Sequence, residues 1–189
     1  MSRINRHIDD HLATIEALRS QIQVIEQIGR LMITCIRDGG CIFWLGNGGS
    51  ATDSQHLAAE LVERFERERP GIRSLALTTD TSVLTAIGND EGFERIFARQ
   101  LEALGCPGDL MIGISTSGNS LNVLAAARAA RNLGLGTVGL SGRDGGKLAA
   151  LVDICLVVPS DNTARIQEAH ILTGHILCDL AEQHVATAG

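Results

Sequence analysis

The sequence predicts an α/β fold in which a five-stranded parallel sheet lies between two layers of helices, a three-layer αβα sandwich. Five short apolar runs alternate with segments of helical periodicity, which is typical of parallel strands joined by right-handed crossovers. The first run, at residues 41–45, is apolar throughout, as expected of a buried parallel strand. A long amphipathic segment precedes the first run, so the prediction includes a long N-terminal helix.

The amphipathic segment, residues 4–37, is predicted to form one long helix or two. Its apolar side chains recur at steps of three and four residues, at Ile8, Leu12, Ile15, Leu18, Ile22, Ile25 and Ile28. Gly39 and Gly40 end it. In a subunit this small, such an apolar stripe would stay exposed unless it met another chain. We therefore expect residues 1–37 to serve in oligomerisation.

The first two strands are expected on either side of a helix. The run CIFWL at 41–45 predicts a buried strand. Residues 50–65 follow with helical character, and Ser50 is a plausible N-cap for them. A break at Arg69-Pro70-Gly71 then leads to a second strand at 74–78.

The second half of the chain repeats the alternation. Residues 80–104 are expected to hold one or two helices around Gly88, Asn89 and Asp90. Apolar runs predict the remaining strands at 109–115, 136–141 and 153–159, and helices are expected at 121–134, within 144–151 and at 162–184. We find no linker or repeat that would divide the chain, so residues 1–189 are expected to form one domain.

Composition limits the classes of function. Hydrophobic residues make up 44% and charged residues 20% of the 189 positions, an ordinary globular balance, and aromatic residues only 3%, so the core must be aliphatic. The net charge of −6 argues against non-specific nucleic-acid binding. We expect no membrane span and no signal peptide, and hence a cytoplasmic location. The odd number of cysteines, without a C-x-x-C pair, predicts reduced, mostly buried thiols.

Two Gly/Ser-rich turns, 46-GNGGS-50 and 115-STSGNS-120, follow the first and third strands. In a parallel sheet both turns lie at the edge where ligands bind. The second turn offers four hydroxyl groups at the start of a helix, whose free N–H groups favour phosphate. It contains no lysine, so it is no Walker A loop. The alternative is a turn whose serine only caps the helix.

Histidine and acidic side chains follow the first turn at helical spacing. His56 and Glu60 are four residues apart and share one helix face, so they can grip one metal or flank one substrate carbon. The alternative is a solvent-facing ion pair. His175 lies in the last, mostly apolar helix, where a histidine that is simply hydrogen-bonded within the core is the alternative to a catalytic one.

Three motifs, GNGGS-x5-H-x3-E, ISTSGNS and ARIQE-x6-H, occur in the same order over essentially the whole chain. Together they resemble the bacterial phosphoheptose isomerases of the sugar isomerase (SIS) domain superfamily. The resemblance implies a five-stranded parallel sheet between helices, and a homotetramer with active sites at subunit interfaces. It also implies that a neighbouring chain can contribute His175.

The resemblance also implies roles for individual residues. The sugar phosphate would be held by the hydroxyls of Ser50, Ser115, Thr116, Ser117 and Ser120. The sugar would be lined by Asn47, Gly48, Gly49, Asn89 and Asp90. Glu60 would be the base, in contact with substrate, and His175 the acid. A zinc ion would be held by His56, Glu60, Gln167 and His175, and Gln167 would touch the substrate as well. No role is implied for His170.

The implied reaction is an aldose–ketose isomerisation. D-sedoheptulose 7-phosphate would become D-glycero-D-manno-heptose 7-phosphate through a cis-enediol(ate), for nucleotide-activated heptose and a surface glycan such as the lipopolysaccharide core. A base removes the C1 proton of the ketose, and the proton returns at C2. Zinc would polarise the carbonyl.

Two other functions remain open. The DnaA initiator-associating protein resembles this chain too and binds DnaA without catalysis. It departs from the isomerase pattern where this chain keeps Glu60 and His175. An isomerase of another sugar phosphate, such as arabinose 5-phosphate, is the second alternative. The long N-terminal helix and the lack of an appended regulatory domain favour the heptose isomerase.

Overall fold

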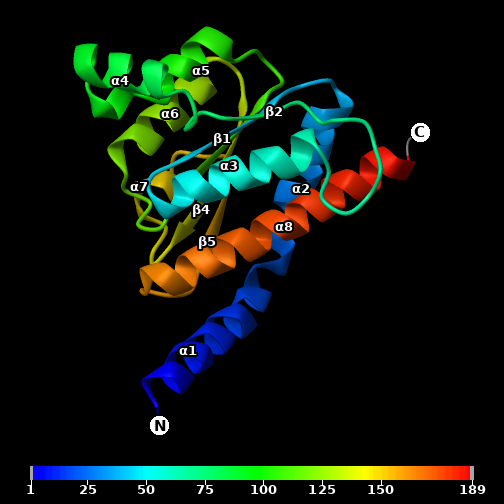
Figure 1. Cartoon of the computed structure of the whole chain (residues 1–189), viewed down its shortest axis with the longest axis vertical. Helices are drawn as coiled ribbons and strands as arrows, with labels where there is room; N and C mark the ends of the chain where they lie inside the picture. The colour runs from blue at the N-terminus through cyan, green and yellow to red at the C-terminus, as the bar shows by residue number, and fades with distance from the viewer. Residues whose placement is uncertain (1, 188–189) are drawn as a thin grey trace.

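A single parallel sheet organises the computed structural model, which describes residues 2–187 (Figure 1). Its strand order is β2-β1-β3-β4-β5. The strands are β1 (Ile42–Gly46), β2 (Ser74–Ala76), β3 (Leu110–Ser115), β4 (Gly136–Gly142) and β5 (Ile154–Val158). In the register, Trp44 pairs with Ala76 on one side and with Ile112 on the other. The predicted five-stranded parallel sheet is confirmed.

Helices cover both faces of the sheet. One layer contains α2 (Ile22–Arg37), α3 (Gly49–Val62) and α8 (Thr163–Thr187), with α1 (Arg3–Leu18) joined to α2 by a 3-10 turn at Arg19–Gln21. The other layer contains α4 (Thr81–Asp90), α5 (Ala98–Leu104), α6 (Leu121–Asn132), α7 (Gly146–Ala149) and a 3-10 turn at Phe93–Arg95. In Figure 1, α1 extends away from the sheet. The N-terminal segment is therefore two helices.

Two aliphatic cores lie on the two faces, and neighbouring residues of one strand alternate between them. Trp44 belongs to the core under α2, α3 and α8, and Phe43 to the core under α5 and α6. The indole nitrogen of Trp44 donates to Ser74 Oγ at 3.0 Å. This alternation follows from the pleat, because successive side chains of a strand point to opposite faces.

Three local predictions were wrong. The helix predicted over residues 50–65 ends earlier, at Val62. Ser50 is not the N-cap of its helix: α3 already begins at Gly49, after Gly48 with a φ of 56°, and Ser50 is buried inside the first turn. A glycine there can take the left-handed conformation that starts the helix one residue early. The second strand ends at Ala76 and not at residue 78, although Leu77 N still donates to Trp44 O at 2.9 Å.

The strand order changes direction between β1 and β3, which is where open α/β sheets have their ligand crevice. The chain leaves β1 toward β2 on one side and returns through β3, β4 and β5 on the other, so the two Gly/Ser-rich turns meet where the direction changes. Within residues 2–187, no helix combines the length and the apolar character that crossing a membrane requires. The five cysteines are free thiols, and burial raises the pKa of Cys35 and of Cys178 to about 12.

Candidate active site

Helices α3 and α8 lie side by side on one face of the sheet (Figure 1). Gly174 allows this close approach, because a Cβ atom at this position would lie 2.5 Å from the δ-carbons of Leu57. The contact therefore depends on the absence of a side chain in the middle of α8. It brings the polar residues of both helices into one cluster.

Three of the predicted residues meet at this cluster. The Nε2 atoms of His56 and His175 lie 3.0 Å apart, and His56 Nε2 lies 3.5 Å from Glu60 Oε1. The side chain of His56 is 46% exposed and that of Glu60 is 21% exposed, so a small molecule can reach both. The alternatives of a solvent-facing ion pair and of a simple core histidine fit less well. His56 and Glu60 do face each other, but His175 contacts His56 as well and is not bonded only within the core.

Phe65 was missed by the sequence analysis. Its ring stacks on His175 with a centroid distance of 5.4 Å and an interplanar angle of 22°, while His56 meets His175 edge-on at 72°. Phe65 lies after the end of α3, outside any helix or strand. The predicted helix over residues 50–65 included Phe65, but α3 ends at Val62, so helical spacing could not place this ring.

The turn between β3 and α6 presents its hydroxyls at the crevice. Ser115 Oγ and Ser120 Oγ lie 3.0 Å apart, and Thr116 and Ser117 are half-buried beside them. Ser120 occupies the N-cap position of α6, yet its side chain makes no capping hydrogen bond. The hydroxyl of Ser120 therefore does not cap α6, and the alternative of a simple capping serine does not apply to it. The hydroxyls and the start of a twelve-residue helix together suit a phosphate.

A second loop fixes the shape of this turn. Gly118 has a φ of 63°, and a Cβ atom there would lie 2.0 Å from the carbonyl oxygen of Gly145. Gly118 O in turn accepts the N–H of Leu148 at 2.9 Å. Backbone atoms that follow β4 therefore hold the turn in place. Any side chain at residue 118 would collide with them.

A pair of asparagines joins the first turn to α6, the helix that follows the second turn. Asn47 Nδ2 donates to Asn122 Oδ1 at 2.9 Å, and Asn122 Nδ2 donates to Asn47 Oδ1 at 2.8 Å. Asn122 is 3% exposed and was not among the predicted residues. Its signal in the sequence was weak, since a polar residue in the first turn of a helix is common. The pair fixes the first turn against α6.

The remaining predicted residues are distributed around the crevice. A Cβ atom on Gly49 would lie 2.6 Å from Gln167 Nε2, so the Gln167 amide lies directly against the first turn. Ser50 is only 3% exposed. Asn89 and Asp90, at the end of α4, are exposed and bond to each other at 2.7 Å. The contacts of the described residues do not join this pair to the histidines.

His170 has a structural position. It is fully buried, and its Nε2–H donates to the carbonyl of Ser141 at 3.0 Å, which ties α8 to the end of β4. Burial lowers its pKa to about 4, against the opposing effect of the bond to Ser141. This histidine is therefore neutral near pH 7 and lies outside the His56–Glu60–His175 cluster.

The donor chemistry of the cluster fits zinc, although its present geometry is that of hydrogen bonds. Across residues 2–187, no group of three or more His, Cys, Asp or Glu side chains has the arrangement of a metal site. The 3.0 Å between the imidazole nitrogens is slightly shorter than the roughly 3.3 Å between two nitrogen ligands of a tetrahedral zinc ion. Imidazole and carboxylate are ordinary zinc ligands, so His56, Glu60 and His175 could hold the ion after a small separation of the rings.

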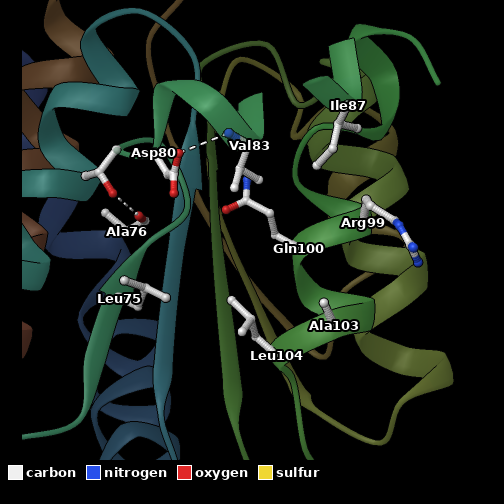
Figure 2. Close-up of a pocket in the computed structure, with 10 residues that line it drawn as sticks. Leu75, Ala76, Asp80, Val83, Ile87, Arg99, Gln100, Ala103 and Leu104 are labelled. Carbon is white, nitrogen blue, oxygen red and sulfur yellow. Dashed lines mark hydrogen bonds between the residues drawn. The ribbon is translucent and has the colours of Figure 1, made fainter. Parts of the chain in front are cut away.

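Two hollows lie beside the Gly/Ser-rich turns, and a more apolar one lies apart from them. One of about 180 Å³ lies against Gly46, Asn47 and Gly48, and one of about 560 Å³ lies against Ser117 and Arg143. A more apolar cavity of about 490 Å³ lies between β2, α4 and α5, with Leu75 and Leu104 on opposite sides (Figure 2). None of the predicted residues lines this cavity. Most of the side chains that line it are apolar, which does not suit a sugar phosphate.

Known proteins are similar to this chain in sequence and in structure. The model of the SIS domain family matches residues 6–142. Phosphoheptose isomerase of Roseiflexus sp. is 55% identical over 183 residues, covering 97% of this chain and 91% of that protein. The solved phosphoheptose isomerase of Neisseria gonorrhoeae superposes with a TM-score of 0.91 at 44% identity, over 96% of this chain and 97% of that one. That of Francisella tularensis gives 0.93 at 39% identity, over 97% and 100%.

Proposed function

The chain belongs to the phosphoheptose isomerases of the SIS domain family, and on that premise we propose that it converts D-sedoheptulose 7-phosphate into D-glycero-D-manno-heptose 7-phosphate. The observation that carries this function is the meeting of His175 with Glu60 and His56, which lie on a helix that starts at the first of two hydroxyl- and glycine-rich turns. A carboxylate and an imidazole next to a phosphate turn are what a proton transfer within a sugar phosphate requires.

Substrate binding begins at the phosphate. The hydroxyls of Ser115, Thr116, Ser117 and Ser120 donate to the phosphate oxygens, assisted by the first N–H groups of α6. Ser50, although buried, belongs to the same group by its place in the first turn. The sugar then extends along Asn47, Gly48 and Gly49 toward Glu60, with Asn89, Asp90 and Gln167 as further contacts.

The proton transfer is assigned to Glu60 and His175. Glu60 removes the proton from C1 of the ketose, and the resulting cis-enediol(ate) receives the proton back at C2. His175 gives and takes protons at the two oxygens. Because Phe65 stacks on the ring of His175 and His56 contacts its Nε2 atom, His175 is held in one orientation. Such preorganisation lowers the cost of reaching the transition state.

We include one zinc ion per subunit in the proposal, held by His56, Glu60, Gln167 and His175. When bound, it would supply a Lewis acid that polarises the substrate carbonyl. The support is the donor set itself. The amide of Gln167, from α8, lies against Gly49 at the start of α3, the helix that carries His56 and Glu60.

A homotetramer is proposed as the working assembly. Large apolar side chains of α1 are exposed, among them Ile4, Ile8 and Leu12, at 71%, 53% and 59%. A groove of about 270 Å³ runs between Ile15, Ile22, Leu172 and Ile176, from the N-terminal helices to α8. Light scattering tests this directly: four subunits of 20.1 kDa are expected, and a fully active monomer would contradict it.

The product is proposed to feed nucleotide-activated heptose for lipopolysaccharide or another surface glycan, in the cytoplasm. Relatives at 50 to 55% identity bear the isomerase name, which favours the enzyme over the DnaA-binding alternative. The substrate is tested by comparing turnover of sedoheptulose 7-phosphate with that of arabinose 5-phosphate and ribulose 5-phosphate. A preference for a pentose phosphate would replace the heptose in the proposal.

A further inference from the structure

We propose that Glu182 and Phe65 form a positioning device for His175, in which Glu182 anchors the segment after α3 so that Phe65 stacks on the histidine ring. This inference rests on the proposed function, since it assigns a catalytic role to His175. Glu182 lies near the C-terminal end of α8, and it is one of the few charged side chains of the described chain that are fully buried.

The anchor is a set of three hydrogen bonds. The carboxylate of Glu182 accepts the backbone N–H groups of Phe65, Glu66 and Arg67 at 2.9, 2.7 and 2.8 Å. Residues 63–73 contain no helix or strand. The N–H groups of Phe65, Glu66 and Arg67 belong to no helix or strand ladder, so Glu182 satisfies them and fixes this part of the segment.

Burial alone would disfavour the charged form of Glu182. The three N–H donors and the charge of Arg69 outweigh that effect, and the pKa of Glu182 lies below its ordinary value. A carboxylate that accepts several backbone N–H groups is stabilised in its charged form. The anchor is therefore an ionised group with fixed geometry.

Arg69 extends the anchor to the helix of the proposed base. Its side chain is buried, and its Nε lies 3.2 Å from Glu182 Oε1 in an ion-pair contact without hydrogen-bond alignment. Its other nitrogens donate to the carbonyl of Glu60 at 2.7 Å and to that of Leu61 at 2.8 Å. The end of α3 is thus tied to the same point of α8 as Phe65.

The consequence for the reaction lies in the ring of His175. Phe65 covers one side of that ring, with the planes 22° apart, and Phe65 is placed by the first of the three hydrogen bonds to Glu182. A proton donor must meet the substrate oxygens at a fixed angle, and a displacement of about 1 Å can reduce the rate about a hundredfold. Glu182 is therefore a positioning residue, which acts on the reaction through Phe65 and His175.

The test compares Phe65→Leu, Phe65→Tyr and Glu182→Gln with the control Asp179→Asn. Asp179 also contacts the segment, but through an exposed pair with Arg67 whose side chains are 40% and 41% exposed. We expect Phe65→Leu and Glu182→Gln to lower kcat by about tenfold to a hundredfold, with KM within about twofold. Phe65→Tyr should restore kcat because it keeps the ring, and Asp179→Asn should leave kcat unchanged.

A spectroscopic measurement separates positioning from stability. In zinc-free protein carrying ¹³C-labelled histidine, the resonance of the His175 ring should move in Glu182→Gln, which keeps the Phe65 ring, and stay in Phe65→Tyr and Asp179→Asn. If Glu182→Gln does not fold, the two Phe65 variants decide. An unmoved resonance, or a kcat that falls only as far as folded protein is lost, overturns the proposal. If the wild type does not isomerise a sugar phosphate, the proposed function fails, while the resonance still tests the positioning.

Discussion

The Nε2 atoms of His56 and His175 lie 3.0 Å apart, although 119 positions separate the two residues in the chain. The contact exists because α3 and α8 approach closely at Gly174, where the Leu57 side chain fills the space that a Cβ atom would need. The chemistry of the site therefore depends on how two helices pack.

Replacing Gly174 by alanine should separate these helices. The new Cβ atom would lie 2.5 Å from the δ-carbons of Leu57, and overpacking of a core costs about 1 to 3 kcal/mol. We expect urea unfolding to show that loss, together with a fall in kcat. Gly88→Ala is the control, because its Cβ would meet only Ile96, at an ordinary 3.9 Å. Equal stability of Gly174→Ala and wild type would contradict the packing argument.

The phosphate turn can be tested at Gly118. Alanine there must adopt a φ of 63° and would place Cβ 2.0 Å from the Gly145 carbonyl oxygen, which is backbone and cannot swing away. We expect a loss of at least about 2 kcal/mol in unfolding free energy, and no protection by inorganic phosphate against heating.

A matched control for this variant is Gly134→Ala. It has a φ of 78°, but its nearest neighbour would be Pro107 Cβ at 3.7 Å, so it isolates the backbone strain from the clash. Its cost should stay near 1 kcal/mol. If the two variants cost the same, the contact with Gly145 does not shape the turn.

The buried His170 should make stability depend on pH. Its pKa is about 4 in the folded protein and 6.5 in an exposed histidine, so between these values the unfolded chain takes up a proton that the folded protein refuses. The contribution of His170 to the free energy of unfolding is therefore fully present above pH 6.5. About 3 kcal/mol of that free energy is lost as the pH falls to 4. His170→Gln, which does not titrate, should lack this component when the unfolding free energies are compared. Parallel pH profiles of the two proteins would contradict it.

Zinc binding is tested by metal content as well as by activity. After incubation with zinc and removal of the excess, we expect about one ion per subunit in the wild type and far less in His56→Ala. His7→Ala is the control, since His7 is exposed on α1, and it should bind zinc like the wild type. Chelation should lower turnover and added zinc should restore it. A wild type that retains no zinc would remove the ion from the mechanism.

The sequence was sufficient for most of the fold. Apolar runs located all five strands. β1 and β3 are buried at every position, as expected of strands covered on both faces, whereas the edge strand β2 leaves Leu75 exposed. Ser50 was wrong as an N-cap, because two glycines before it can start the helix by themselves. The end of β2 was placed too late, because Leu77 is buried like a strand residue although the strand stops at Ala76.

From the spacing of residues alone, the candidate site was predictable only where its residues are close in sequence. His56 and Glu60 share a helix face by their spacing alone. The position of His175 beside them depends on the packing at Gly174, which spacing does not encode. Phe65 lies in an irregular segment. Glu182 is a buried carboxylate, although a glutamate at this position looks like a surface residue in the sequence. Both became visible only through their contacts.

The central claim is that Glu60 removes a proton from a heptose phosphate bound at the two turns. The most direct measurement is turnover of sedoheptulose 7-phosphate by the zinc-supplied wild type beside Glu60→Gln, with melting temperatures for both. The account predicts turnover by the wild type, and a loss of about a hundredfold to ten-thousandfold in a variant that melts normally. No turnover by the wild type, or equal turnover by both proteins, would contradict it.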